Sequence, residues 1–333
     1  MADLQQAAGF DLIGDVHGCA LTLRLLLERM GYNQVDGHYQ HRQRHAIFVG
    51  DVIDRGPRIR EALGIVKAMV DAGGATMLMG NHEYNALCYC TPVDGQSDTF
   101  LREHSPRHLR LIKDTLEEYE AHPEEWQGML DWFLTLPLFL ELESCRVVHA
   151  CWDSQLIDQY QQRYGSNQLN DQRLRESVDK STLSGRLMDR LTRGLDIRLP
   201  DGLTVTSKDG FVRHFFRAHF WKDNPETYND VVFQPDPLPE PIAHRRMSPQ
   251  EKQRLFHYDG EQKPLFIGHY WRTGTPQAIT SNIACLDYSA VKYGKLVAYR
   301  MDQETSLCNS KFVWIDVDPQ EPDLPERESD ADD

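Results

Sequence analysis

The sequence predicts an α/β layered fold, because short apolar runs alternate with amphipathic segments through the first half of the chain. Three consecutive units each begin with a run typical of a buried strand and continue into a segment with the apolar spacing of a helix. Each strand ends at a polar residue that directly follows a glycine. We expect the strands at residues 10–15, 45–51 and 75–81, and the helices at residues 20–30, 59–73 and 82–88.

The second half of the chain adds further helices and strands. A polar loop is expected over residues 91–108, followed by helices at 109–121 and 124–135. The segment 154–263 is polar and helical in its first part, contains one alternating strand at 212–221, and is Pro-rich afterwards. Strands are also expected at residues 138–142, 145–149, 264–271, 283–289, 295–301 and 311–317.

The polar residues at the first three strand ends are Asp15, Asp51 and Asn81. Ligands of α/β proteins gather outside the carboxyl ends of the strands, so these side chains are candidates for a binding site. The glycines before them, which let the backbone turn sharply, are Gly14, Gly50 and Gly80. For Asn81 taken alone, a capped helix start is the simpler interpretation, because Asn is a favourable N-cap residue.

The chain is acidic, with a net charge of -15 over 333 residues. Residues 316–333 hold nine acidic side chains and one arginine, and we expect them to form a disordered, solvated tail after a domain at 1–315. The remaining acidic body argues against broad nucleic-acid binding, which relies on a basic surface. A small anionic substrate stays possible, because bound metal ions can supply a local positive field.

The cysteines and the N-terminus predict a cytoplasmic protein with free thiols. The seven cysteines form no CxxC pair, and the first residues lack the basic-then-apolar order of a signal peptide. The densest apolar stretch is nine residues long, whereas a spanning helix needs about 20, so no membrane association is expected.

Three short motifs occupy the strand ends: GDVHG at 14–18, GDVIDRG at 50–56 and GNHE at 80–83. His149 and His269, each at a later strand end, complete the set. Each motif is weak alone, but the combination resembles the metallophosphoesterase superfamily of calcineurin-like fold, and within it the phosphoprotein phosphatase family. The residues GDVHGC and LLLERMGY are similar to those of the bacterial branch. This branch includes PrpE-type phosphatases, symmetrical diadenosine tetraphosphatase and the phosphatase module of polynucleotide kinase-phosphatase.

This resemblance implies a β-sandwich flanked by helices, with a site for two divalent cations. A two-metal phosphoesterase needs a bridging carboxylate, and oxygen and imidazole ligands suit Mn, with Fe or Zn as alternatives. Asp15 and His17 can reach one ion together, because residues i and i+2 of an extended segment point to the same side. The implied ligands are Asp15 and His17 for the first metal, Asp51 as the bridge, and Asn81, His149 and His269 for the second. For each histidine taken alone, a structural role is the alternative.

The resemblance also implies in-line attack on phosphorus by a metal-bound hydroxide. His82 would then be the general acid, with Asp54 paired to it, and Arg55 would clamp the phosphate through its planar fork. A surface salt bridge at a turn is the alternative for Arg55. Glu83 is expected to support the site indirectly or to interact with the helix dipole.

A second phosphate-binding arginine is expected between the last two histidines or just beyond them. Candidates are Arg213, Arg217 and Arg272, and a solvated strand edge covered by arginine stems is the alternative. Asp287 resembles a supporting acidic residue of the bacterial branch, and a turn residue at a strand end is the alternative for it.

The sequence therefore predicts a metal-dependent phosphatase that hydrolyses phosphomonoesters. The inserted segment 154–263 would form a cap over the strand ends, which favours a small phosphorylated molecule or nucleotide, although a Ser/Thr/Tyr phosphoprotein stays open as substrate. One alternative is a symmetrical dinucleoside tetraphosphate hydrolase. Another is a catalytically inactive metal-binding scaffold, which intact Asp54, Arg55 and His82 speak against. A nucleic-acid end-processing phosphatase is disfavoured by the acidic body and the missing kinase P-loop.

Overall fold

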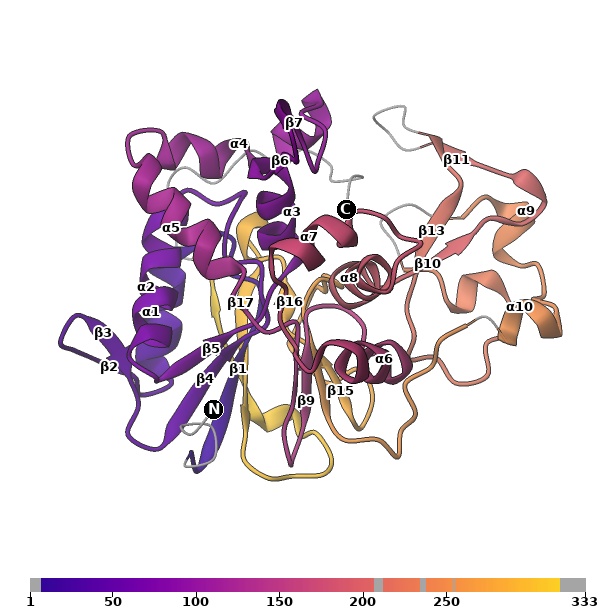
Figure 1. Cartoon of the computed structure of the whole chain (residues 1–333). Coiled ribbons are helices and arrows are strands. Elements are labelled where there is room, and N and C mark those ends of the chain that lie inside the picture. The colour runs from indigo at the N-terminus through magenta and orange to yellow at the C-terminus, as the bar shows by residue number, and fades with distance from the viewer. Residues whose placement is uncertain (1–6, 207–211, 234–237, 254, 318–333) are drawn as a thin grey trace.

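Two β-sheets lie face to face at the centre of the protein, with helices on the outer face of each (Figure 1). The computed structural model describes residues 7–206, 212–233, 238–253 and 255–317. Within these residues the layered α/β architecture is confirmed, because each sheet is covered on one side by the other sheet and on the other side by helices.

The larger sheet contains the strands β1 (Gly9–Ile13), β4 (Arg44–Phe48), β5 (Ala75–Met77), β16 (Asp287–Tyr288), β17 (Lys295–Met301) and β18 (Phe312–Asp316). Its order is β16–β17–β1–β4–β5, and β18 pairs with β17. Strand β4 runs parallel to both β1 and β5. The carboxyl ends of these three strands therefore meet at one edge, as the motifs predict.

The smaller sheet contains β8 (Phe139–Glu141), β9 (Arg146–Val148), β14 (Leu265–Ile267) and β15 (Ile283–Cys285). Its order is β15–β14–β9–β8, and β14 runs parallel to both β9 and β15. The strands that carry the motifs and His149 and His269 end before the apolar runs that predict them, because the last residues of each run leave the ladder and form the loops at the strand ends.

Alternate residues of the central strands face different cores. Leu12 and Ile47 of the larger sheet pack against Val147 and Phe266 of the smaller sheet. The adjacent residues Ile13 and Phe48 point to the opposite face of the larger sheet. They belong to another core, which they share with residues of α1 (Ala20–Arg29) and α2 (Ile59–Asp71). Strands covered on both faces read as continuous apolar runs, which explains why the sequence shows no clear alternation there.

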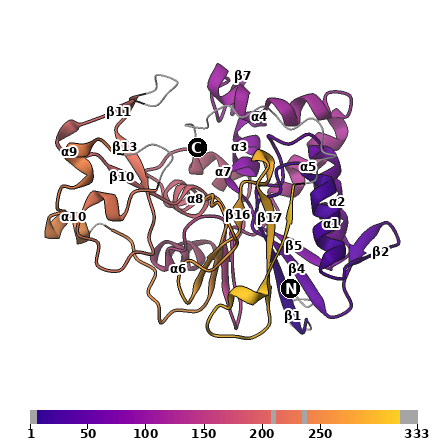
Figure 2. The ribbon, with the colours of Figure 1, turned by 180° about the vertical axis from the view of Figure 1, so that it is seen from behind.

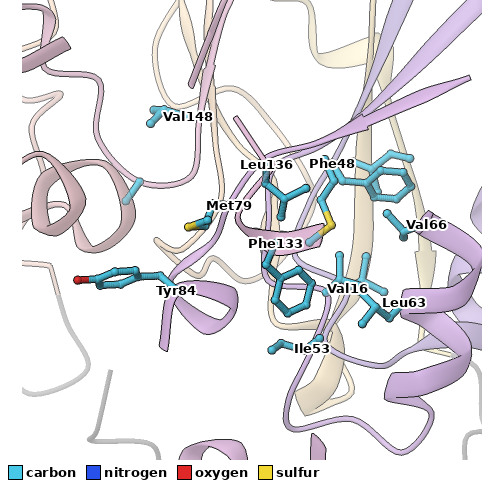
Figure 3. Close-up of a cluster of buried hydrophobic side chains, with 14 of the residues drawn as sticks. Val16, Phe48, Ile53, Leu63, Val66, Met79, Tyr84, Phe133, Leu136 and Val148 are labelled. Carbon is cyan, nitrogen blue, oxygen red and sulfur yellow. The ribbon is translucent and has the colours of Figure 1, made fainter. Parts of the chain in front are cut away.

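Apolar residues inside the motifs anchor the loops that carry the polar ones. Val16 of GDVHG and Ile53 of GDVIDRG are fully buried and lie beside Phe133 (Figure 3). Leu63 of α2 completes this contact from the other side. The nearby helices are α3 (Asn81–Cys90), α4 (Pro106–Tyr119) and α5 (Pro123–Phe133). The loops at the strand ends therefore rest on a packed apolar base.

The segment 154–263 divides into two differently packed parts. Helices α6 (Ser154–Tyr164), α7 (Asp171–Ser177) and α8 (Leu183–Arg193) pack on the main core. The following residues form a lobe with its own core, on the opposite side of the protein from α1 and α2 (Figures 1 and 2). Its elements are β10 (Leu195–Arg198), β11 (Val205–Thr206), β12 (Val212–Arg213), β13 (Phe215–Ala218), α9 (Glu240–Ala243) and α10 (Pro249–Gln253).

Three expected elements differ in the structure. The strand expected at 283–289 divides into β15, which pairs with β14 of the smaller sheet, and β16, which pairs with β17 of the larger sheet. The polar loop after α3 contains a hairpin of β6 (Pro92–Val93) and β7 (Gln96–Phe100). The single strand expected at 212–221 is two short strands, because β12 pairs with β11 whereas β13 pairs with β10. A further hairpin, β2 (Asn33–Val35) and β3 (His38–Gln40), follows α1.

The structure describes the expected domain from residue 7 and the acidic tail only to residue 317. Strand β18 runs to Asp316, whose carboxylate accepts a hydrogen bond from Lys295 Nζ at 2.6 Å. The rest of the acidic tail, from residue 318, lies outside the described residues. All seven cysteines carry free thiols. Among the described residues, no helix combines the length and the apolar character needed to cross a membrane.

Candidate metal centre

The predicted site residues come together where the two sheets present their strand ends. Asp15, Asp51 and Asn81 follow β1, β4 and β5, whereas His149 and His269 follow β9 and β14 of the other sheet. All but Asn81 are buried. The site therefore depends on the packing of one sheet on the other, and each sheet contributes part of it.

Two histidines are oriented by backbone carbonyls. The Nδ1 atom of His17 donates to the carbonyl of Ile53 at 2.8 Å, and that of His149 donates to the carbonyl of Val49 at 2.9 Å. A ring that donates from Nδ1 presents the lone pair of Nε2 on its opposite side, which is how most metal-binding histidines are held. Both rings are therefore arranged as metal ligands.

Asp51 is shared by two groups of possible ligands. Its Oδ2 lies 3.2 Å from His149 Nε2 and 3.8 Å from His17 Nε2. The side-chain oxygen of Asn81 lies 2.9 Å from His149 Nε2 and 2.8 Å from His269 Nδ1. The groups able to hold a cation are Asp51 with His149 and His269, and Asp51 with His17 and His82. A carboxylate common to two such groups has the geometry of a bridge between two cations.

The buried carboxylates require a compensating positive charge. Burial, followed by the charges of Asp287 and Asp51, raises the pKa of Asp15 well above its usual range. The Asp15 Oδ1 atom is buried and has no hydrogen-bond partner among the described residues. Unpaired buried charge is costly, and carboxylates in such surroundings pair or coordinate metals. The residues present therefore fit divalent cations.

The histidines differ in the charge they carry. Burial, and then the neighbouring His82 and Arg55, lower the pKa of His17 to about 3, so its ring is neutral and able to bind a metal. Burial also acts to lower the pKa of His149, but the charge of Asp51 and its hydrogen bond raise that pKa to about 10. These surroundings favour a positive charge beside Asp51, which a metal cation can supply in place of a proton.

His82 is paired with Asp54 and faces the metal site with its other nitrogen. Its Nδ1 donates to Asp54 Oδ2 at 2.6 Å, and its Nε2 is buried without a hydrogen-bond partner among the described residues. Burial acts to lower the pKa of His82, but Asp51 and the bond with Asp54 leave it raised. Thr115, which the sequence analysis did not identify, donates its hydroxyl to Asp54 and accepts from the Asp54 N–H at 3.1 Å.

Glu83 joins two strand-end loops. One of its oxygens accepts from the N–H groups of Asp51 at 2.9 Å and Gly80 at 3.0 Å. The other accepts from Val52 at 2.9 Å and Ile53 at 3.4 Å. The side chain is fully buried. Glu83 thereby fixes the backbone of the shared carboxylate, and Gly80, not Asn81, occupies the N-cap position of α3.

The backbone at the site is strained. Five of the nine described non-glycine residues with positive φ are site residues: His17, Asp51, Asp54, Arg55 and His269. Such conformations cost about 1–3 kcal/mol each and persist where the surroundings enforce them. Gly50 has φ +108, as expected for a sharp turn, but a Cβ on Gly80 would lie 2.1 Å from Asp51 Oδ1. At Gly80 the reason for glycine is therefore space, because its φ is -87°.

Two cavities are lined by residues of this cluster. The first is lined by Arg55 together with Asp15, His17, Asp51, His269 and Asp287. Asp287 lies there as expected, and it also forms a strand-end turn, because its Oδ1 accepts from the Ser289 N–H at 2.8 Å. The position of Asp287 is compatible with both interpretations, and its supporting role stays a prediction.

The second cavity is lined by one of the three candidate arginines. Arg217 lines it beside Asn81, His82 and His269, whereas Arg213 and Arg272 line neither cavity. Three arginines that the sequence analysis did not select also line it: Arg102, Arg107 and Arg193. They come from segments without a recognisable motif, so only the folded chain brings them to the site.

The comparisons with known proteins agree with this geometry. The chain is 32% identical over 146 residues to bis(5'-nucleosyl)-tetraphosphatase PrpE [asymmetrical] of Oceanobacillus iheyensis, covering 42% of this chain and 54% of the relative. It is 45% identical over 74 residues to the protein of the same name from Halalkalibacterium halodurans, covering 22% and 30%. The chain therefore spans about half the length, or less, of these relatives.

A solved structure also matches over most of the chain. It is a protein serine/threonine phosphatase from Saccharomyces cerevisiae, with a TM-score of 0.52, 12% identity, and coverage of 94% of this chain and 80% of the other. This likeness concerns the fold. The model of the calcineurin-like phosphoesterase family matches residues 10–245, which is more than two thirds of the sequence. The chain belongs to the calcineurin-like phosphoesterase family.

Proposed function

We propose that the protein is a phosphatase that hydrolyses phosphate esters with two divalent cations. The observation that carries this proposal is the position of Asp51, whose Oδ2 lies 3.2 Å from His149 Nε2 and 3.8 Å from His17 Nε2. The buried Nε2 of His82 lies 4.0 Å from the same oxygen and has no hydrogen-bond partner among the described residues. A structural histidine cluster would not need an acid–carboxylate pair beside a shared carboxylate. The proposed ligands are Asp15 and His17 for one cation, Asp51 for both, and Asn81, His149 and His269 for the other.

The roles of the remaining residues follow from their positions. When bound, the cations supply an acidified water and positive charge beside the phosphoryl oxygens. Arg55 orients the phosphoryl group from the first cavity, and Arg217 contacts it from the second. As the oxygen of water bonds to phosphorus and the bond to the leaving oxygen breaks, His82 Nε2 gives its proton to that leaving oxygen. Asp54 stabilises the imidazolium and holds its Nδ1–H.

Thr115 is a positioning residue in this scheme, because it acts on His82 only through Asp54. We expect Thr115→Val to lower kcat for an alkyl phosphate about tenfold and for p-nitrophenyl phosphate much less, since only the alkyl leaving group depends on protonation. Thr115→Ser should restore the ratio of the two rates. If Thr115→Val loses both activities equally and Thr115→Ser does not restore the ratio, Thr115 contributes only to the stability of the fold.

Hydrolysis of p-nitrophenyl phosphate by the metal-loaded chain tests the proposal directly. We expect turnover with Mn, Fe or Zn after removal of metals by a chelator, and none in the chelated protein. Elemental analysis should give two ions per chain. A chain that holds both ions and still shows no turnover with any of the three metals would instead support an inactive metal-binding scaffold.

A dinucleoside tetraphosphate hydrolase is the second candidate, favoured by the names of the two curated relatives. The sequence analysis raised the symmetrical reaction, whereas those relatives carry the asymmetrical name. Product analysis separates the forms, because symmetrical cleavage of diadenosine tetraphosphate yields two ADP molecules and asymmetrical cleavage yields ATP and AMP. A rate on this compound below that on a simple phosphomonoester would argue against both forms.

A further inference from the structure

The second cavity, of about 130 Å³, is lined by four arginines and no carboxylate. The arginines come from four parts of the chain. Arg102 lies after β7, Arg107 in the first turn of α4, Arg193 at the end of α8 and Arg217 on β13. Convergence of four separate segments on one cavity is a tertiary arrangement, and it contrasts with the net charge of -15 of the whole chain.

A buried amide inside the cavity lacks a partner. Asn85 also lines the cavity and is 8% exposed, and its Nδ2 has no hydrogen-bond partner among the described residues. It follows Asn81 by four residues on α3, so the two side chains share one helix face about 6 Å apart along the axis. A buried N–H donor without a partner is uncommon, and an anionic acceptor in the cavity would satisfy it.

Arg102 is held in place as part of the cavity wall. Its backbone N–H donates to the Cys88 carbonyl at 2.9 Å, and its guanidinium lies 6.0 Å from the centre of the Tyr84 ring. Its Nε is buried without a hydrogen-bond partner among the described residues. Guanidinium groups stay charged at every physiological pH, so a cavity lined by four arginines and by no carboxylate suits an anionic ligand.

The position of His82 indicates which part of the substrate would occupy this cavity. His82 lines it, and in the proposed function His82 protonates the leaving oxygen, so the leaving group departs into this space. For a simple phosphomonoester that group is a neutral alcohol, which four arginines would not help to bind. An anionic leaving group fits the charge of the wall.

We propose that Asn85, Arg102, Arg107 and Arg193 form a subsite for a second phosphoryl group carried by the leaving group. This inference rests on the proposed function and narrows its substrate class to compounds with at least two phosphoryl groups. A phosphoanhydride places the second group next to the first, whereas a bisphosphorylated sugar places it further away. The subsite disfavours a phosphoprotein side chain, whose leaving group is an uncharged hydroxyl.

A charge-matched pair of double variants tests the subsite. Arg107→Gln with Arg193→Gln removes two lining arginines from α4 and α8. Arg110→Gln with Arg186→Gln removes two exposed arginines from the same helices, outside the cavity lining. Both proteins lose two positive charges, so any difference between them reflects position and not net charge.

The readout is kcat/KM for inorganic tripolyphosphate, for a sugar bisphosphate and for p-nitrophenyl phosphate, with the metal-loaded chain. In the lining variant we expect the ratio of the tripolyphosphate value to the p-nitrophenyl phosphate value to fall at least about tenfold, mainly through KM. The control variant should keep the wild-type ratio. If kcat/KM falls only for the sugar bisphosphate, the subsite binds a second phosphoryl group carried on a sugar and not one joined in a phosphoanhydride.

Three results would overturn the subsite. The first is a lining variant whose kcat/KM, relative to that for p-nitrophenyl phosphate, is unchanged for both tripolyphosphate and the sugar bisphosphate. The second is an equal fall in the control variant, and the third is a wild-type preference for a phosphopeptide over both of these compounds. These results differ from a failure of the proposed function itself, in which the wild-type chain with both metals would not hydrolyse p-nitrophenyl phosphate at all.

Discussion

Replacing His82 with alanine is expected to lower kcat for an alkyl phosphate about 10²–10⁴-fold while both cations stay bound. The reason is the geometry of the pair: Nδ1 is bound to Asp54 at 2.6 Å, and the buried Nε2 has no hydrogen-bond partner among the described residues. An alkoxide is a strongly basic leaving group and needs that proton as the bond to phosphorus breaks. p-Nitrophenolate is weakly basic, so its release should slow by less than about tenfold.

The measurement compares both substrates in the same enzyme preparation, with the metal content determined in parallel. His45→Ala is the matched control. His45 is also buried and bonds Thr76 Oγ1 at 2.8 Å, but it lies on β4 away from the strand end. It should lower stability and leave the ratio of the two rates unchanged. Equal losses on both substrates in His82→Ala, or loss of a cation, would assign His82 to the metal site.

Replacing Glu83 should have the second large effect, on both stability and metal binding. Its carboxylate accepts four backbone N–H bonds at buried positions, among them that of Asp51. Glu83→Ala leaves these donors without that partner, and we expect the free energy of unfolding to fall by about 2–4 kcal/mol. Asp51 has φ +53, so release of its N–H should let the backbone relax and move the shared carboxylate.

Glu83→Gln keeps the size of the side chain but turns an NH2 group toward two N–H donors. It should fold with reduced stability and bind the cations more weakly, as measured by urea unfolding and by metal titration. Glu118→Ala is the control, because Glu118 also accepts two backbone N–H bonds, from Ile59 at 2.7 Å and Arg60 at 2.8 Å. It should lower stability without changing metal affinity. A Glu83→Gln protein with wild-type metal affinity would contradict the positioning role.

The sequence predicts the strand ends well because the chemistry there is local. GDVHG, GDVIDRG and GNHE each place a polar residue where an apolar strand stops, and parallel pairing of β1, β4 and β5 then brings the three ends together. The same sequences encode their own anchors, since Val16 and Ile53 inside the motifs enter the core. His149 and His269 could be identified as strand-end histidines before their contacts were known.

The hydrogen-bond partners of Glu83 and the choice among the arginines could not be predicted in this way. Glu83 belongs to a motif, but its partners at Asp51 and Val52 lie on another loop, so its function depends on how closely the two loops approach. Arg217 was one of three candidates that local alternation could not separate. In the folded chain Arg217 of β13 lines the second cavity together with residues of α3, while Arg213 and Arg272 line neither cavity.

The sequence by itself therefore determined the strand-end chemistry: the order of elements, the candidate ligands and the acid–carboxylate pair. Only the tertiary structure decided what surrounds that chemistry, namely Thr115 behind Asp54 and the arginine wall with Asn85 beyond His82. The physical reason is the sequence separation of the residues that interact. Strand ends and motif spacing are set by neighbouring residues, whereas the second cavity is formed by segments more than a hundred residues apart, whose meeting depends on the whole packed core.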